Sequence, residues 1–139
     1  MKSAYAKPLP KVTSEDHPFW EACRQHKFVL PRCKTCGHVW FPPYLQCNKC
    51  LSPDREFFQA SGRGIIWGRI EMNQPYIPAF VDDLPYVVAL IQLAEGPFMY
   101  ANILGATNDA IKVGLPVEVV FDDVTPDFTL PKFRLRTSP

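Results

Sequence analysis

The sequence predicts a mainly β protein built from an N-terminal helical segment, a small metal-binding ribbon and a five-stranded C-terminal barrel. Four cysteines stand in two pairs, Cys33-x-x-Cys36 and Cys47-x-x-Cys50, with ten residues between the pairs. From Gly62 onward, short runs of β-branched and aromatic residues alternate with turn residues. Five such runs in this length of chain suit a small Greek-key barrel of the OB type.

Length and composition set the limits of this prediction. The chain has 139 residues, of which 47% are hydrophobic, and a formal net charge of +1. That length allows a small metal module beside one core domain. We therefore expect an arm and a helix over residues 1–30, the ribbon over residues 31–60 and the OB fold over residues 61–139. No apolar run reaches membrane-spanning length. Reduced thiols make the cytoplasm the expected location.

The first predicted element is a short helix. Thr13 or Ser14 is expected to cap it, and the helix is expected to run from His17 to Lys27. Phe19 and Trp20 fall near one face of this helix. A helix so short is unstable alone, so this face must pack against its own domain or against a partner.

The two cysteine pairs predict a structural zinc site. Two cysteines two residues apart present both sulfurs to one metal, and two such turns complete a tetrahedral shell of four thiolates. Gly37 follows the first pair, where the turn often requires a positive φ. Iron fits the same ligands, and two disulfides are a further alternative, although five cysteines are an odd number. The closed shell predicts no catalysis at the metal. Cys23, outside the cluster, is expected to be a packed thiol.

The ribbon carries more large apolar side chains than it can bury. A strand over residues 28–31 leads into the first cysteine pair, and residues 39–44 are expected to form the hairpin of the ribbon. Trp40, Phe41 and Tyr44 lie in that hairpin. They cover either a seam between the modules or a surface for a ligand or partner. Residues 51–61 are expected to be a linker.

The barrel strands are predicted from their apolar runs. They are expected over residues 64–71, 85–93, 98–104, 116–122 and 130–136, with a short turn or helical stub over residues 107–112. Glycines in the first strand suggest a bend or bulge. The second strand is almost continuously apolar, which is typical of a strand buried at least in part on both faces.

The longest strand-free stretch of the barrel half covers residues 72–84. Loops are usually polar, but this one contains Tyr76 and Phe80. These rings either contact a ligand or partner at the mouth of the barrel or fold back over its end.

The order of several short motifs resembles a known family. The motifs are Pro18-Phe19-Trp20-Glu21, the first cysteine pair with Gly37, Phe41-Pro42-Pro43, the second cysteine pair, Ser61-Gly62-Arg63-Gly64, Leu84-Pro85-Tyr86 and Gly114-Leu115-Pro116. The family was once known only as a domain of unknown function and is associated with acyl-CoA chemistry. Its members combine an N-terminal helical segment, a rubredoxin-like zinc ribbon and a C-terminal OB fold. The resemblance covers about residues 14–136.

The resemblance implies an accessory subunit of a thiolase-like protein, including thiolases of the sterol-carrier-protein type. Such complexes cleave a CoA ester by thiolysis or by a retro-aldol reaction in the degradation of steroid side chains or aromatic compounds. The catalytic residues belong mostly to the thiolase-like subunit, and a two-plus-two assembly is typical. The sequence itself shows no nucleophile–base pattern of its own. We therefore expect a noncatalytic subunit of a hetero-oligomer.

The resemblance also suggests roles for individual side chains. Cations would bind the phosphates of CoA, and aromatic rings would line its pantetheine arm or stack on adenine. The candidates for acyl-CoA are Arg63, Tyr76, Phe80, Lys132, Arg134 and Arg136. The candidates for contact with the partner are Phe19, Trp20, Trp40, Phe41 and Tyr44. For the C-terminal cations, a solvated tail is the alternative.

A second class of function stays open at this point. Zinc ribbons and OB folds both occur in proteins that bind single-stranded nucleic acid. The near-neutral charge argues against this class, because such proteins usually show a basic field or stripe. The acidic pairs Asp82-Asp83 and Asp122-Asp123 stand beside turns, where they are expected to be solvated rather than to act as acid or base.

Overall fold

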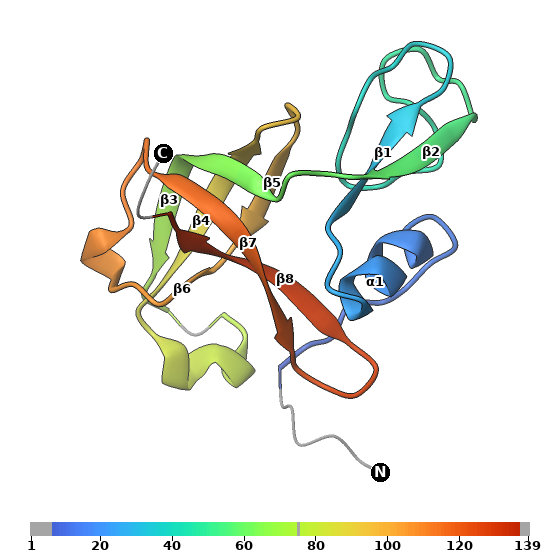
Figure 1. Ribbon diagram of the computed structural model, residues 1–139. Coiled ribbons are helices and arrows are strands. Elements are labelled where there is room, and N and C mark those ends of the chain that lie inside the picture. The colour runs from blue at the N-terminus through green and yellow to red at the C-terminus, as the bar shows by residue number, and fades with distance from the viewer. Residues whose placement is uncertain (1–6, 75, 137–139) are drawn as a thin grey trace.

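One α-helix and eight strands form two lobes in the computed structural model, which describes residues 7–74 and 76–136 (Figure 1). The elements are α1 (His17–Arg24), β1 (Val29–Cys33), β2 (Arg55–Gln59), β3 (Arg63–Met72), β4 (Tyr86–Leu93), β5 (Phe98–Ala101), β6 (Ile103–Leu104), β7 (Pro116–Asp123) and β8 (Thr129–Leu135), with 3-10 turns at Pro78–Asp83 and Asn108–Ala110. The strands β3 to β8 make one lobe. The helix and the β1–β2 ribbon make the other (Figure 1).

The helix α1 is shorter than the sequence predicts. It ends at Arg24, and His26 then adopts a left-handed φ of 58°, a conformation that stops a helix. The capping prediction is also wrong. Asp16 occupies the N-cap position, and the backbone N–H and hydroxyl of Thr13 donate to its carboxylate at 2.7 and 3.1 Å. The acidic side chain therefore anchors the preceding turn instead of capping the helix.

The predicted ribbon hairpin is wrong as well. The strand β1 pairs with β2, from Val29 opposite Gln59 to Cys33 opposite Arg55, in the stretch expected to be a linker. Of residues 39–44, Val39 alone forms a bridge, opposite Arg32. The two prolines that follow Phe41 lack N–H groups and cannot extend a ladder.

The six strands of the second lobe form an OB barrel, as predicted. Their order in the sheet is β5-β4-β3-β7-β8-β6, so the two outer strands are consecutive in the chain and the sheet curls towards closure. The predicted single strand over residues 98–104 is divided at Asn102. Its side-chain amide donates to the Val87 carbonyl at 3.1 Å, and the chain then crosses to pair in parallel with β8.

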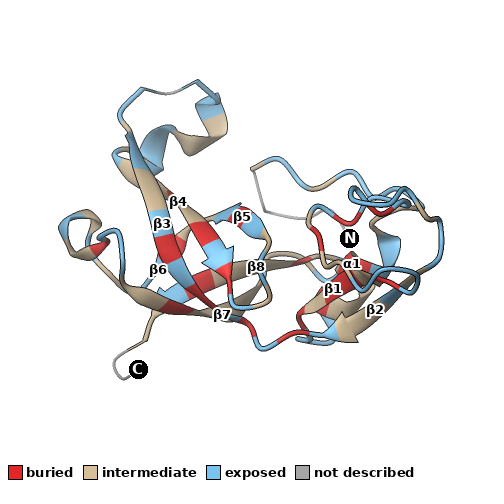
Figure 2. Cartoon of the chain, turned by 90° about the horizontal axis from the view of Figure 1, so that it is seen from above, coloured by how far each residue is buried: buried red, intermediate tan, exposed pale blue. Residues whose placement is uncertain are grey.

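The helix, the start of the ribbon and the barrel share one hydrophobic core. Phe19 and Phe28 from the first lobe join Ile91 and Phe133 from the barrel, and all four are at most 2% exposed. Figure 2 shows buried segments in both lobes. The Phe28 and Phe133 rings meet edge to face, with centroids 6.2 Å apart. The lobes are therefore packed together rather than loosely linked. Among the described residues, no helix has the length and apolar character needed to cross a membrane.

The glycines of β3 show why this strand bends. The register with β4 shifts between Ile66 and Gly68, which is the predicted bulge. At Gly64, a Cβ atom would lie 2.7 Å from both the Gln92 carbonyl oxygen and Cγ2 of Ile91. Only glycine allows the backbones of β3 and β4 to approach this closely.

We expect Gly64→Ala to lower the free energy of unfolding by about 1–3 kcal/mol, the usual cost of inserting a methyl group into a packed site. Gly68→Ala is the matched control, because its Cβ would meet only Cβ of Leu90 at 4.0 Å. Urea denaturation of both variants measures the difference. Equal losses of stability in the two variants would show that the close approach of β3 and β4 is not what requires glycine at position 64.

Candidate metal centre and ligand pockets

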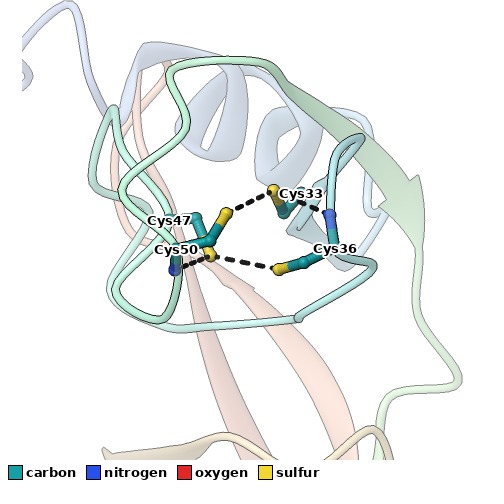
Figure 3. Close-up of side chains that lie close together, drawn as sticks. All are labelled: Cys33, Cys36, Cys47 and Cys50. Atoms are coloured by element: carbon teal, nitrogen blue, oxygen red, sulfur yellow. Dashed lines mark hydrogen bonds between the residues drawn. The ribbon is translucent and has the colours of Figure 1, made fainter.

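Four sulfur atoms converge between two turns of the ribbon (Figure 3). The Sγ atoms of Cys33, Cys36, Cys47 and Cys50 all lie within 4.8 Å of one another. The Cys33–Cys50 and Cys36–Cys47 sulfur pairs are 3.5 and 3.6 Å apart. A tetrahedral zinc site with Zn–S bonds of about 2.3 Å requires sulfurs about 3.8 Å apart. The cluster therefore fits zinc in a structural, closed shell.

Backbone N–H groups support the sulfurs from within each turn. The N–H of Cys36 donates to Cys33 Sγ at 3.4 Å, and the N–H groups of Lys49 and Cys50 donate to Cys47 Sγ at 3.3 and 3.4 Å. Gly37 follows the first turn with a φ of 80°, as predicted. This arrangement favours thiolates over thiols.

The acidity of the cysteines reflects these surroundings. Desolvation opposes ionisation of Cys33, but the N–H groups of Cys36 and Thr35 outweigh it and lower the pKa of Cys33 to about 6. The N–H of Ser52 favours a Cys50 thiolate, yet desolvation and the neighbouring sulfurs raise its pKa to about 12. A bound cation removes this competition, because coordination deprotonates thiols.

The cysteine outside the cluster is a packed core residue. All five cysteines are free thiols, so the structure contains neither of the two alternative disulfides. Cys23 is fully buried, and burial raises the pKa of its thiol to about 12. A thiol with so high a pKa is a poor nucleophile.

Arg55 ties the ribbon to the turn before α1, a role that no local sequence pattern indicates. Its guanidinium donates to the carbonyls of Pro43 and Tyr44 at 2.7 and 3.0 Å, and to the Glu15 carbonyl at 2.9 Å. The acceptors are backbone atoms up to 40 residues away. Trp40 stabilises the same loop by donating Nε1–H to the Tyr44 carbonyl at 3.2 Å.

The five predicted partner contacts differ in exposure. Phe19 and Trp40 are each 2% exposed, which leaves them almost no surface for a partner. Trp20 and Phe41 are half-buried against the core. Tyr44 is 54% exposed, and Leu45 and Leu51 beside it are also exposed. These three exposed residues, which we call the ribbon patch, remain available for docking.

A pocket of about 370 Å³ lies where the helix, the ribbon and the barrel meet. We call it the junction pocket. Its walls come from α1, from the loop after Phe41, from β5 and from the start of β8. The lining is mainly apolar but includes Asp16 and Lys132; the other side chains include Phe19, Trp20, Phe41, Pro42, Met99, Tyr100 and Leu130.

A second pocket of about 380 Å³, the mouth pocket, adjoins the first and shares Asn102, Leu130 and Lys132 with it. Phe80 lines the mouth pocket and folds back towards Tyr86, with ring centroids 5.8 Å apart. Tyr76 is 72% exposed and is not among the lining residues. Of the two aromatic rings of the loop over residues 72–84, Phe80 therefore lines a pocket and Tyr76 remains exposed.

The predicted phosphate-binding cations do not form one cluster. Arg63 and Arg134 lie on either side of Glu118 across three neighbouring strands, and Arg134 bonds Glu118 at 2.9 Å. Lys132 instead reaches both pockets and pairs with Asp122 at 2.6 Å. Of the predicted acyl-CoA residues, the structure brings Phe80 and Lys132 to one site.

The acidic residues at the end of β7 are partly exposed, and each has a side-chain partner. Asp123 accepts hydrogen bonds from the hydroxyl of Thr129 and from Nε2 of His26, the latter at 2.9 Å to Oδ1. The His26 ring also stacks on Phe121, with centroids 5.2 Å apart. This contact ties the end of the helix to the barrel.

The Asp123 contacts predict a pH effect on stability. The Thr129 hydroxyl, and to a lesser degree His26, lower the pKa of Asp123 below its usual value. A lowered folded-state pKa stabilises the protein above the unfolded pKa, and this contribution is lost as pH falls through the folded value. We expect Asp123→Asn to be less stable than the wild type in urea at pH 6, and this difference to shrink below about pH 4. An undiminished difference at pH 3 would contradict this account.

Two family profiles match the chain in the order of its lobes. Residues 20–55 match the rubredoxin-like zinc ribbon domain of ChsH2, and residues 58–122 match the C-terminal OB-fold domain of ChsH2. Both matches agree with the architecture and with the four-cysteine cluster.

Similar curated proteins and a solved structure extend this comparison. The chain is 37% identical over 129 residues to a probable enoyl-CoA hydratase alpha subunit of Thermomonospora curvata; the match covers 92% of this chain, which spans 40% of that relative. It is 36% identical over 102 residues to a DUF35 domain-containing scaffold protein of Methanothermobacter thermautotrophicus, covering 73% of this chain and 76% of that protein. It superposes on a chain of the Ltp2-ChsH2(DUF35) aldolase with a TM-score of 0.82 and 35% identity, covering 91% of this chain and 98% of the other.

Proposed function

The chain belongs to the DUF35 family, whose ChsH2-type members carry a rubredoxin-like zinc ribbon and a C-terminal OB fold, and from that premise we propose that it is a noncatalytic accessory subunit that binds acyl-CoA and a thiolase-like partner. In such a hetero-oligomer, the partner performs thiolytic or retro-aldol cleavage of a CoA ester. The substrate class is a CoA ester from steroid side-chain or aromatic-compound degradation. A sterol-carrier-protein-type thiolase in a two-plus-two assembly is the proposed partner.

The junction pocket supports the part of this proposal that concerns acyl-CoA binding. Acyl-CoA combines an apolar acyl–pantetheine arm with phosphates at the far end. A mainly apolar pocket with a cation at its rim suits such a molecule. The mouth pocket continues from it, and Lys132 borders both. An extended ligand could therefore run from one pocket into the other past this ammonium group.

The zinc site supports the proposal in a structural role. Its four ligands close the coordination shell, so the metal holds the ribbon rigid and leaves catalysis to the partner. The ribbon supplies the wall of the junction pocket formed by Phe41 and Pro42. A rigid ribbon thus keeps the pocket shaped for its ligand.

Titration of the partner complex with acetyl-CoA and free CoA tests the ligand site. Lys132→Gln is expected to weaken binding about 10- to 100-fold, because a hydrogen bond from a charged group is lost. Asp122→Asn is the matched control: it keeps the ammonium group and removes only its acidic neighbour, so binding should be equal or tighter. Unchanged binding by Lys132→Gln would show that the ligand does not bind at this site.

The nucleic-acid alternative has less support. Several surface cations of the described chain are paired with carboxylates, including Arg32 with Glu56 and Arg134 with Glu118. Binding of a single strand needs a positively charged groove that follows the backbone, whereas the formal net charge of this chain is +1. Binding to single-stranded DNA across a salt series checks this alternative, since phosphate contacts give a steep loss of affinity with salt.

A further inference from the structure

One outer face of the barrel is apolar, and most of its side chains are exposed within the part of the chain that the structure describes. The strands β3, β4 and β5 lie side by side, and their register places Ile65, Gln92 and Phe98 in one row and Gly68, Leu90 and Tyr100 in the next. Trp67 at the bulge and Ile70 extend the same face. We call Ile65, Trp67, Ile70, Leu90, Phe98 and Tyr100 the aromatic face. Buried residues alternate with exposed ones in the first half of β3 and mainly with half-buried ones along β4 (Figure 2).

The composition of β4 does not suit a face in contact with water. Its inner residues Val87, Ala89 and Ile91 are at most 4% exposed and fill the barrel. A strand with one solvated face normally carries polar residues at the outer positions, but the outer positions here include Val88 and Leu90. The sequence predicted a strand buried at least in part on both faces, and the outer residues Val88 and Leu90 are indeed only half-buried.

The opposite part of the barrel provides an internal comparison. On β7 and β8, the outer positions carry the ion pairs Glu118–Arg134 and Asp122–Lys132. The outer face of β7 and β8 therefore carries charged side chains that suit contact with water. The six residues of the aromatic face include no charged side chain. General barrel architecture cannot explain this difference, since both faces belong to one sheet.

The aromatic face is large enough to contribute to a stable interface. Trp67 is 60% exposed, Tyr100 70% and Phe98 40%. At 150–250 Å² per aromatic side chain, these three expose on the order of 300 Å². With the aliphatic neighbours, the area is on the order of 500 Å², more than half of the roughly 800 Å² per partner of a standard interface. The Trp67 and Phe98 rings already meet edge to face at 5.5 Å, so they lose little freedom on docking.

The shape of the face favours a different protein over a second copy of this chain. The outside of a barrel is convex, and two convex faces would touch only along a narrow strip. A flat or concave surface buries much more of the face. Because the face lacks charge, the matching surface must be apolar and uncharged as well.

The position of the face connects it with the ligand pocket. Tyr100 belongs to the aromatic face and also lines the junction pocket. Phe98 lines a groove of about 570 Å³ whose other wall is the ribbon at Trp40 and Phe41. A protein seated on the face would therefore reach the rim of the junction pocket.

We propose that the aromatic face docks the thiolase-like partner through a flat or concave, uncharged apolar surface, and that this docking brings the partner to the edge of the junction pocket. This inference rests on the proposed function, because it names the surface used by that same partner. It differs from docking through the ribbon patch alone.

The test compares two variants in complex with the thiolase-like partner. The double variant Trp67→Ser/Tyr100→Ser removes two exposed aromatic side chains of the face, and Tyr44→Ser removes one of similar exposure from the ribbon patch. Zinc content and urea denaturation first establish that both are folded. Binding is then measured by surface plasmon resonance with the wild type, the variants and the purified partner.

We expect the double variant to raise the Kd at least about 100-fold, as loss of central aromatic anchors usually does, and Tyr44→Ser to change it much less. A folded double variant that binds like the wild type would overturn the inference while leaving the proposed function intact. Failure of the wild type itself to bind would instead overturn the proposed function, and the inference with it. Self-association of the wild type that the double variant abolishes would assign the face to a second copy and overturn the inference alone.

Discussion

Replacing the fully buried zinc ligand Cys47 by alanine is expected to unfold the ribbon and abolish metal binding. Binding of structural zinc contributes about 10–16 kcal/mol in small ribbon-like modules, as much as the whole stability of an ordinary domain. The cysteine-bearing end of the ribbon has little else to hold it, because the separate core there consists of Cys33, Trp40 and Cys47. Loss of zinc therefore removes both the cross-link and the centre of this core.

Metal analysis and thermal unfolding of purified Cys47→Ala measure this effect. The wild type should contain about one zinc per chain, and the variant close to none. Cys23→Ala is the matched control, because it removes a buried thiol outside the cluster and should keep the metal. A metal-free Cys47→Ala protein with a wild-type melting curve would contradict a structural metal site, and bound iron would change the identity of the metal but not its role.

Replacing Phe19 by alanine is expected to lower the free energy of unfolding by about 3–5 kcal/mol, the usual cost of a large cavity in a core. Phe19 joins the helix to the ribbon, because its ring centroid lies 5.3 Å from that of Phe41. Its ring centroid also lies 6.1 Å from that of Phe28, whose ring in turn meets Phe133 of the barrel. The cavity would also enlarge the junction pocket, of which Phe19 forms part of the wall.

Urea denaturation of Phe19→Ala measures the loss of stability. Titration of its partner complex with acetyl-CoA measures how the enlarged junction pocket changes ligand binding. Trp20→Ala is the control, since this neighbour is only half-buried and its removal leaves a smaller cavity. The Phe19 variant should be the less stable of the two. If Trp20→Ala were the more damaging change, the core would not depend on Phe19 as its arrangement indicates.

Local patterns in the sequence were enough to predict the metal centre and most barrel strands. The two cysteine pairs form knuckles because each is only four residues long and is followed by a residue with positive φ, Gly37 and Leu51. The barrel strands β3, β4 and β7 follow from apolar runs whose alternation is a local property. Family resemblance added the order of the parts, which the profile matches confirm.

The errors in the ribbon and the barrel concern contacts between distant residues. Pairing of β1 with β2 joins Val29 to Gln59, and nothing local distinguishes β2 from a linker. The side-chain amide of Asn102, which bonds the Val87 carbonyl where β5 and β6 separate, gives no signal in a strand-like run. Arg55 donates hydrogen bonds to backbone carbonyl groups. Because every residue has such a group, no sequence pattern identifies the acceptors.

The candidate ligand site was predictable only in part for the same reason. The junction pocket combines side chains from α1, the loop after Phe41, β5 and β8, and no sequence pattern links these segments. Lys132 was selected as a basic residue in the last strand, but its position between two pockets depends on the closure of the barrel. Arg63 and Arg134 have the same charge and face Glu118 instead.

Co-purification tests the central claim, that this chain acts as the accessory subunit of a thiolase-like protein, most directly. A tagged chain is expressed with the reading frames that neighbour its gene, and the eluted proteins are identified by mass spectrometry while zinc is quantified in the same sample. The account predicts a thiolase-like protein in stoichiometric amount with a zinc-loaded chain. A fully zinc-loaded chain that elutes alone, or with nucleic acid, would contradict it.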